Sequence, residues 1–138
     1  MKNITVSYKT AVALKEAGFP QPKPQTGQFW WHKHPSRAKT LDFVQDVEII
    51  EKNECFYTIW VGDEDTGGNF YTCNDHNLIF APQAHDILEQ MGWEYYLLFE
   101  QTGQQWFCNK PNDETGIWCD KNPHEAAAKA YLFQKNVT

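Results

Sequence analysis

"WEYYLLFEQTGQQWFCNK", residues 93–110, decides the fold class of this chain. Two apolar, aromatic-rich stretches, 93–100 and 104–110, flank a short polar segment that contains Gly103. Such a pattern is typical of a β-hairpin, whose two strands run antiparallel. Because helical patterns lie on both sides of this hairpin, the sequence predicts an α+β protein.

The first strand of this hairpin carries apolar side chains on both faces. Successive residues of a strand point to opposite faces, so one face, expected to be core, is formed by Trp93, Tyr95, Leu97 and Phe99. The other face combines Tyr96 and Leu98 with Glu94 and Glu100. Either a helix or another copy of the chain could cover this second apolar face, and both alternatives stay open.

Two helices are predicted from apolar periodicity and from end signals. The first follows Ser7, a favourable N-cap residue, and ends at Gly18, which can adopt the left-handed conformation of a helix end. The second lies within residues 82–92 and ends at Gly92. Its apolar stripe consists of Ala84, Ile87, Leu88 and Met91.

A third helix begins at "NPHE", residues 122–125. Asn122 is its predicted cap, Pro123 its first helical residue, and Glu125 stands where an acidic side chain answers the cap. The small side chains of Ala126, Ala127 and Ala130 would let this helix lie close against a sheet.

Further strands are predicted at 28–34, 54–61, 77–81 and 117–119, and an acidic, Gly-rich turn at 62–69 leads into a strand that begins "FYTC". Residues 35–50 hold another strand or a short helix. The predicted fold is therefore one antiparallel sheet of about five to six strands packed with three helices, of which the N-terminal and C-terminal helices flank the sheet. A single domain spanning residues 1–138 is expected.

The composition is that of a globular, acidic protein. Hydrophobic residues make up 41% of the 138 residues, charged residues 22% and aromatic residues 15%. Eighteen acidic residues against twelve basic ones give a net charge of −6, without the basic patch that phosphate backbones require. Non-specific nucleic-acid binding is not expected.

No signal peptide and no membrane span are recognised, so a cytoplasmic location in a bacterial host cell is expected, with no membrane partner. The four cysteines, Cys55, Cys73, Cys108 and Cys119, form no C-x-x-C pair and are expected to be thiols.

Cys73 and His76 lie three positions apart, a spacing that can hold a metal ion, and His32 and His34 could form a second pair. Two isolated pairs are weak evidence for a zinc site, and "CNDHN" is better explained as turn chemistry. No metal and no cofactor are predicted.

No catalytic residue is predicted either. The sequence has two serines, Ser7 and Ser36, and no G-x-S-x-G, P-loop or G-x-G-x-x-G motif. Cys108 and Cys119 lie in apolar strands, as inert thiols do. These patterns favour a protein that is not an enzyme.

Several segments carry a resemblance to a known group of proteins. "VSYKTAVALKEAGFPQ" followed by "FWW", then "FAPQAHDILEQMG", "WEYYLLFE" with "QQWFC", and "GIWCDKNPHEAAAKAYLFQK" resemble a family of small uncharacterised proteins of tailed phages, prophages and related mobile elements. Residues 35–66 lie outside the resemblance and look like an insertion, and Gln83 stands where the family usually has Thr or Ser. The resemblance implies a scaffold and no known activity.

The function expected from these observations is that of a non-enzymatic accessory protein that binds an unknown protein partner or forms a homo-oligomer. Its expected binding residues are Trp30, Trp31 and Trp60, aromatic side chains left over from the core. Two alternatives stay open. One is a small enzyme with a cleft formed by carboxylates and histidines, with Asp75, Asp86, His76 and His85 as its candidate residues. The other is a module that stacks single-stranded nucleic acid on Trp and Tyr.

Overall fold

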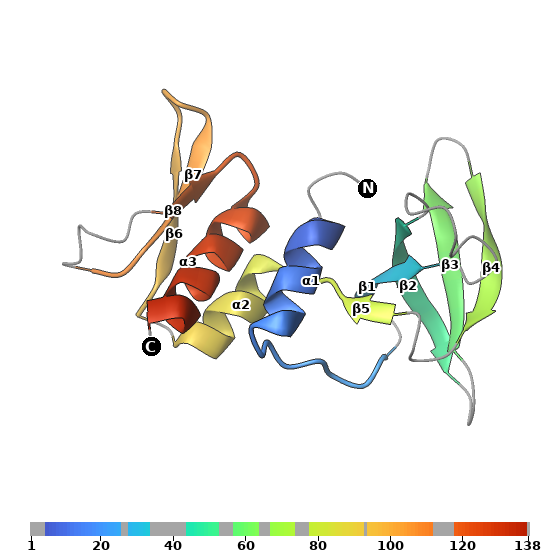
Figure 1. The fold of residues 1–138 in the computed structure, drawn as a ribbon. Helices are drawn as coiled ribbons and strands as arrows, with labels where there is room; N and C mark the ends of the chain where they lie inside the picture. Colours follow the sequence, from blue (N-terminus) through green and yellow to red (C-terminus); the bar gives the residue numbers. More distant parts are fainter. Residues whose placement is uncertain are drawn as a thin grey trace. The chain divides into compact units, whose positions relative to one another are not determined.

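The fold is taken from a computed structural model (Figure 1). The structure describes residues 5–25, 28–33, 44–52, 57–63, 67–73, 78–92, 94–111 and 118–137. Within these ranges the chain forms three helices and eight strands, and every strand pair is antiparallel. The predicted α+β class with three helices is confirmed.

The strands lie in two sheets, whereas the sequence predicted one. A five-stranded sheet has the order β4-β3-β2-β1-β5, and a three-stranded sheet has the order β6-β7-β8. The reason is local: most strands pair with their sequence neighbours through short connections, and helix α2 separates β5 from β6 along the chain.

The chain divides into two compact units. Unit 1 comprises Met1 and Pro20–Ala81, and unit 2 comprises Lys2–Phe19 and Pro82–Thr138. Unit 2 is therefore assembled from both ends of the sequence, with unit 1 inserted between them. Residues 35–66, which look like an insertion in the sequence, lie within unit 1. The single domain expected from the sequence stays a prediction.

Unit 1 contains the five-stranded sheet. Its strands are β1 (Phe29–Lys33), β2 (Val44–Lys52), β3 (Tyr57–Asp63), β4 (Gly67–Cys73) and β5 (Leu78–Phe80). Most of β2 lies in the segment 35–50, for which the sequence left strand and helix open. The register between β2 and β3 shifts between Ile49 and Glu51, which marks a β-bulge or irregularity.

Trp30 is at the centre of the part of unit 1 whose side chains are described. It pairs with Val47 on one side and with Phe80 on the other. Its ring is 3% exposed and lies 5.2 Å from the ring of Phe80. The connector at 20–24 is anchored to the same strand, because the N–H of Phe80 donates to Gln21 Oε1 over 3.1 Å.

Unit 2 begins with helix α1 (Tyr8–Glu16), whose ends are those predicted. Ser7 is the N-cap, and its Oγ accepts from the N–H of Thr10. At the other end Gly18 has φ +94°, a conformation that a residue with a Cβ rarely adopts. The N–H of Phe19 then donates to Leu14 O over 2.9 Å, and this turn places the Phe19 ring in the core.

Helix α2 (Ala84–Met91) confirms the predicted apolar stripe. Ala84, Ile87 and Met91 are buried and Leu88 is half-buried. The N-cap is Gln83, and its N–H donates to Asp86 Oδ2 over 2.9 Å. An acidic side chain in the first turn also interacts favourably with the helix dipole.

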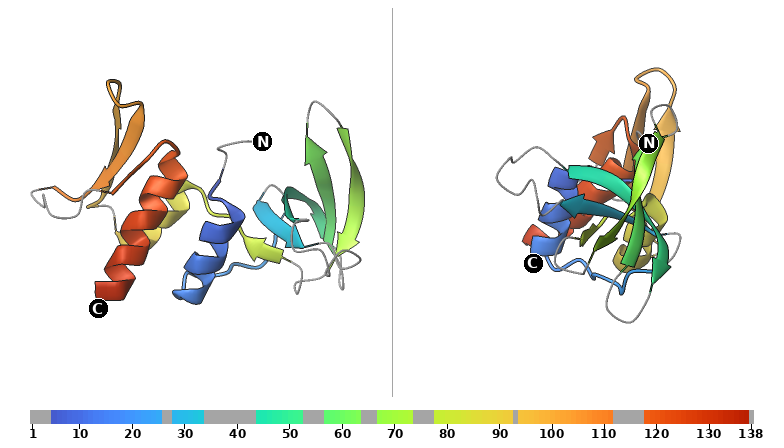
Figure 2. Two further views of the ribbon diagram at one scale, coloured as in Figure 1. Left: turned by 45° about the horizontal axis from the view of Figure 1, so that its top comes forward. Right: turned by 90° about the vertical axis from the view of Figure 1, so that its right-hand side faces the viewer.

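Helix α3 (Pro123–Val137) is the central element of unit 2. It contacts α1, α2 and two strands, β7 and β8 (Figure 2). Close approach on several sides requires small side chains, and four alanines of this helix are at most 1% exposed: Ala126, Ala127, Ala128 and Ala130. The sequence predicted that these small side chains let the helix lie close against a sheet, and the helix also contacts two other helices.

The three-stranded sheet consists of β6 (Tyr96–Glu100), β7 (Gln105–Asn109) and β8 (Trp118–Asp120). Strand β6 begins three residues later than the sequence predicted, because Glu94 lies in a turn and the N–H of Tyr95 donates to Gly92 O. The turn at 101–104 joins β6 to β7, and its left-handed residue is Gln104, with φ +52°.

Candidate functional site

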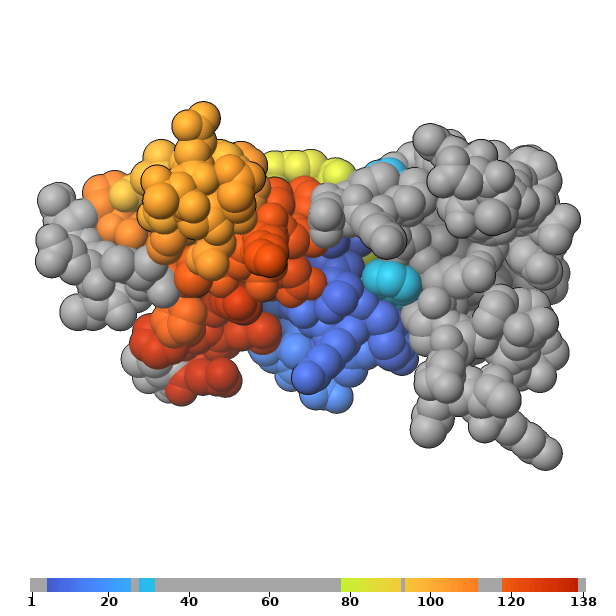
Figure 3. Space-filling model, turned by 90° about the horizontal axis from the view of Figure 1, so that it is seen from above, coloured from blue at the N-terminus to red at the C-terminus, as the bar shows by residue number. Residues whose placement is uncertain are grey.

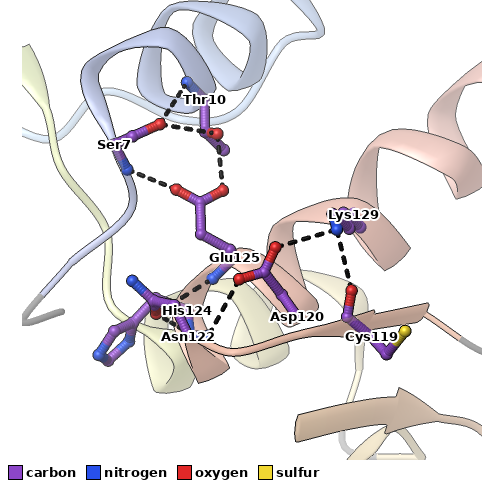
Figure 4. Close-up of polar contacts among 8 residues, drawn as sticks. All are labelled: Ser7, Thr10, Cys119, Asp120, Asn122, His124, Glu125 and Lys129. Carbon is purple, nitrogen blue, oxygen red and sulfur yellow. Dashed lines mark hydrogen bonds and ion pairs between the residues drawn. The ribbon is translucent and has the colours of Figure 1, made fainter. Parts of the chain in front are cut away.

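Unit 2 contains two candidate functional sites, a polar cluster at the starts of the helices and the exposed strand β6. The polar cluster centres on Glu125 (Figure 4). Its carboxylate accepts from the N–H of Ser7 over 2.6 Å and from Thr10 Oγ1 over 2.7 Å. Glu125 therefore caps the start of α1, although the sequence predicted that it would answer the cap of its own helix.

The neighbours of Glu125 extend the cluster to the other two helices. Asn122 Oδ1 accepts from the N–H of His124, as predicted for the cap of α3, and Asn122 Nδ2 donates to Thr5 O. His124 Nδ1 accepts from the N–H of Ala84, the first residue of α2, over 2.8 Å. The segment "NPHE" thus satisfies orphan N–H groups at the starts of three helices.

Asp120 completes the cluster next to α3. Burial acts to raise the pKa of this carboxyl, but the hydrogen bond from the N–H of Asn122 and the contact with Lys129 outweigh it, so the pKa is lowered. The Nζ of Lys129 lies 3.0 Å from Asp120 Oδ2 and 2.9 Å from Cys119 O. These contacts join α3 to strand β8.

The chemistry of the cluster is therefore that of helix capping. Both oxygens of the Glu125 carboxylate accept hydrogen bonds, and the Nδ1 of His124 is engaged by a backbone amide. An Nδ1 that accepts a hydrogen bond carries no proton, so this imidazole is held in one tautomer. The arrangement connects elements that are far apart in the sequence, and we assign it to stability.

Strand β6 is different, because it is the edge of its sheet. Among the described strands it pairs with β7 alone. In β8, Trp118 contacts Phe133 of α3, with ring centroids 4.5 Å apart, and Asp120 contacts Lys129 of the same helix. The face with these two residues is the one that α3 covers.

The register then divides the residues of the whole sheet between its faces. The face toward α3 contains Leu97, Phe99, Trp106, Cys108, Trp118 and Asp120. The opposite face, which we call the outer face, contains the less polar residues Tyr96, Leu98, Phe107 and Cys119 together with the polar residues Glu100, Gln105 and Asn109. On it, Leu98 pairs with Phe107, which pairs with Cys119, so apolar contact continues across all three strands.

Three large apolar side chains of β6 are exposed. The exposed fractions are 43% for Tyr96, 58% for Leu98 and 39% for Phe99. Figure 3 looks down on the tip of this hairpin, which is in light orange and lies in front of the helices of unit 2. Side chains of this size usually contribute to a core or to an interface.

The face toward α3 is buried at Cys108, whereas its residues in the edge strand β6 are partly exposed. Cys108 is 0% exposed, and burial raises the pKa of its thiol to about 11. A thiol with so high a pKa is a poor nucleophile at neutral pH, so the sequence-based expectation of an inert Cys108 agrees with its position. Phe99 and Trp106 pack together on the same face, with ring centroids 5.1 Å apart.

The charges near β6 lie at its two ends. Glu94 precedes the strand and forms an exposed ion pair with Lys110 over 3.4 Å. Glu100 is the last residue of the strand and is exposed. Residues 95–99 between them are uncharged.

The three predicted binding residues belong to unit 1. Trp30 is buried, and its Nε1 donates to Gln28 Oε1 over 3.2 Å, so it is a core residue in this structure. Trp31, its neighbour in β1, is half-buried. Trp60 pairs with Glu48 and Phe70 in the sheet, and its side chain lies outside the described residues. A binding role for Trp31 and Trp60 stays a prediction.

The residues of the enzymatic and metal alternatives are described in part. His85 is exposed on α2, and its Nε2 lies 3.3 Å from Asp86 Oδ1, whose other oxygen caps the helix. Asp75, His76 and His34 lie outside the described residues, as do the side chains of Cys73 and His32. Within the described part of the chain, no group of three or more His, Cys, Asp or Glu side chains could hold a metal ion.

Comparisons with known proteins give no relative. No protein-family model, curated protein or solved structure matches the chain. The resemblance to phage and mobile-element proteins therefore stays a prediction. Of the helices that the structure describes, none is long and apolar enough to cross a membrane.

Sequence reasoning did not single out the exposed residues of β6 as a binding site, and its choice of Trp31 and Trp60 stays a prediction. It assigned Tyr96 and Leu98 to a second apolar face but selected three tryptophans as the site. Large side chains are conspicuous in a sequence, whereas the edge position of a strand depends on which strands pair. One sequence signal was available, namely an apolar strand without Lys or Pro, the residues that commonly protect an edge.

Proposed function

We propose that this chain is a non-enzymatic protein-interaction scaffold, of the kind that phages and mobile elements encode as accessory proteins, and that it binds its partner through strand β6. One observation carries the proposal: Tyr96, Leu98 and Phe99 are exposed on an edge strand. An open edge supplies unpaired N–H and C=O groups, and the exposed side chains supply apolar area.

The mode of binding that fits this surface is strand addition. A strand of the partner pairs with β6 through main-chain hydrogen bonds, which contribute affinity, and alternate side chains contact the outer face, which contributes specificity. The outer-face row of Leu98, Phe107 and Cys119 continues the apolar contact inward from the edge.

The test is a comparison of three tagged proteins in cells that carry the gene. Leu98→Lys places a charge at the most exposed apolar position of β6. Thr102→Lys adds the same charge in the exposed turn beside the strand and serves as the matched control. We expect at least one untagged protein, either a different protein or an untagged copy of this chain, to be retained by the wild-type chain and by Thr102→Lys and to be lost with Leu98→Lys.

Identical sets of retained proteins for all three chains would overturn the proposal. Both variants must first show the wild-type far-UV circular dichroism spectrum. Exposed substitutions of this kind usually change stability by less than about 0.5 kcal/mol, so loss of the fold is not expected.

A further inference from the structure

We infer that the occupant of the β6 edge is β6 of a second copy of this chain, paired antiparallel about a two-fold axis at Leu98. This inference rests on the proposed function, because it names the partner of the same surface. The dimer would join two three-stranded sheets into one six-stranded sheet with the order β8-β7-β6-β6-β7-β8.

Strand β6 lacks the features that protect an edge strand from self-pairing. Proteins protect edge strands from self-pairing with Lys, with Pro, with inward-pointing charges or with bulges. Strand β6 has none of these between Tyr96 and Phe99, and it pairs with β7 residue by residue without a register shift. A regular, apolar edge of this kind favours pairing with another strand.

Symmetry limits how two copies of β6 can pair. A two-fold axis that relates adjacent antiparallel strands of one sheet is perpendicular to the sheet, so it keeps each side chain on its own face. Directly opposite residues must lie on the same face. The axis must therefore pass midway between a residue and its own copy in the second chain, and we name the axis by that residue. Within β6 this leaves five choices, Tyr96 to Glu100.

Only the axis at Leu98 pairs all five residues of β6 with β6 of the second copy. Leu98 is then opposite Leu98 of the other copy on the outer face. Tyr96 is opposite Glu100 on the same face, where a phenol can donate to a carboxylate. Leu97 is opposite Phe99 on the face toward α3. Apolar residues thus meet apolar residues, and the one acidic residue meets a hydrogen-bond donor.

Other axis positions bring unfavourable neighbours together. An axis at Leu97 places Glu100 opposite Glu94 twice, and an axis at Glu100 places that carboxylate opposite itself. Like charges directly opposite each other destabilise a strand pair. Axes at Tyr96 and Phe99 avoid this repulsion, but they place Leu98 opposite Glu94 and Glu100 respectively.

The dimer is expected to be weak and sensitive to salt. A pair of five-residue strands buries much less than the roughly 1,600 Å² of a standard interface, so a micromolar or weaker dissociation constant is expected. Each copy carries a net charge of −6, and salt screens the repulsion between copies. Dimerisation should therefore strengthen as the salt concentration rises.

The first experiment is sedimentation equilibrium of the full chain over a range of concentrations and at two salt concentrations. We expect a reversible monomer–dimer equilibrium for the wild-type chain and for Thr102→Lys. Leu98→Lys places two ammonium groups opposite each other, and we expect at least about a tenfold higher dissociation constant. A wild-type chain that remains monomeric, or a dimer that Leu98→Lys leaves unchanged, would contradict the inference.

The second experiment tests the register by disulfide formation. Directly opposite residues of an antiparallel pair have Cα atoms about 4.5 to 5.5 Å apart, which a disulfide can bridge. Leu98→Cys should therefore cross-link to itself. Tyr96→Cys and Glu100→Cys should cross-link when mixed and neither should do so alone, apart from the background of the wild-type chain. Any other pattern would refute the Leu98 axis.

The two proposals can fail separately. If the wild-type chain is monomeric but retains another protein in a way that depends on Leu98, the inferred dimer is wrong and the proposed function stands. If the dimer forms and no other protein is retained, the occupant is the second copy alone. If neither is observed, both proposals fall.

Discussion

Glu125 holds together two helices that are more than a hundred residues apart in the sequence. Its two carboxylate oxygens accept from Ser7 and Thr10 at the start of α1, while its own backbone N–H faces the cap residue Asn122. The N-termini of two helices thus share one negative charge, which the helix dipoles favour. Removing the Glu125 side chain leaves the donors of Ser7 and Thr10 without their acceptor.

We expect Glu125→Ala to lower the free energy of unfolding by about 2 kcal/mol, since hydrogen bonds to charged groups contribute roughly 1.5 to 3 kcal/mol and these are partly exposed. The measurement is urea unfolding followed by circular dichroism at neutral pH. Glu89→Ala, an exposed position in the middle of α2, is the control and should change the value by less than about 0.5 kcal/mol. Equal losses in both variants would contradict the capping role.

Asp120 provides a prediction about pH. Its pKa is lowered from 3.8 in the folded chain, so the folded state favours the ionised carboxylate. The resulting stabilisation is present above pH 3.8, the value expected in the unfolded chain, and is lost as the pH falls through the lower folded-state pKa. Asp120→Asn should therefore be less stable than the wild-type chain at neutral pH, and this difference should shrink well below pH 3.8.

Unfolding curves at several pH values check this, with Glu94→Gln as the control. Glu94 is more exposed than Asp120 and forms only a surface ion pair with Lys110. Its substitution should have little effect at any pH. A difference between wild type and Asp120→Asn that is independent of pH would show that the carboxylate's charge is unimportant.

At the scale of the element, the turn between β6 and β7 has a positive φ at a residue with a side chain. This residue is Gln104, with φ +52°, and not the neighbouring Gly103. For a residue with a Cβ the left-handed conformation costs about 1 kcal/mol. The exposed hydrogen bond from Gln104 Nε2 to Gln101 O offsets a small part of that cost.

We expect Gln104→Gly to stabilise the chain by about 0.5 to 1 kcal/mol, because glycine adopts positive φ without steric cost. Thermal or urea unfolding measures the change. The matched substitution Gln105→Gly, one residue later at the first position of strand β7, should destabilise the chain, since glycine loses more conformational freedom in a strand and has no side chain to pack. If both substitutions destabilise to the same degree, the turn conformation is not as described.

At the scale of the whole molecule, unit 2 contains both ends of the sequence. Residues 20–81 form a separate compact unit, and the contacts that join α1 to the C-terminal part include Val6 N–H to Pro82 O and the bonds of Glu125. Unit 1 is therefore an insertion into unit 2, and we expect unit 2 to fold without it.

The test replaces residues 20–81 with a Gly/Ser linker of about 14 residues. Pro82 lies beside Val6, just before α1, and Phe19 lies just after α1. The nine helical residues span about 14 Å and the flanking residues add several more, so the ends to be joined lie about 20 Å apart, which matches the average span of such a linker. We expect a helical circular dichroism spectrum and cooperative urea unfolding, and Glu125→Ala should destabilise this shorter chain as it does the full one. Absence of cooperative unfolding would show that unit 2 depends on residues 20–81.

Local signals were sufficient for much of the fold. Ser7, Gly18 and Asn122 mark helix ends through bonds to groups a few residues away, and the stripe of α2 depends on a period of 3.6 residues. Such interactions are contained in short stretches, so the sequence predicts them well. The strands of unit 1 were also predicted, except for β2, whose charged and apolar residues alternate without a clear boundary.

The sequence by itself determined the α+β class, the three helices, their caps and the antiparallel pairing of neighbouring strands, because each depends on residues close together in the chain. Only the tertiary structure decided that the strands form two sheets, that Glu125 and His124 cap helices other than their own, and that Leu98 lies at an exposed edge while Trp30 is buried. These facts depend on which distant segments meet, and a side chain's exposure or hydrogen-bond partner is set by that meeting and not by its neighbours in sequence.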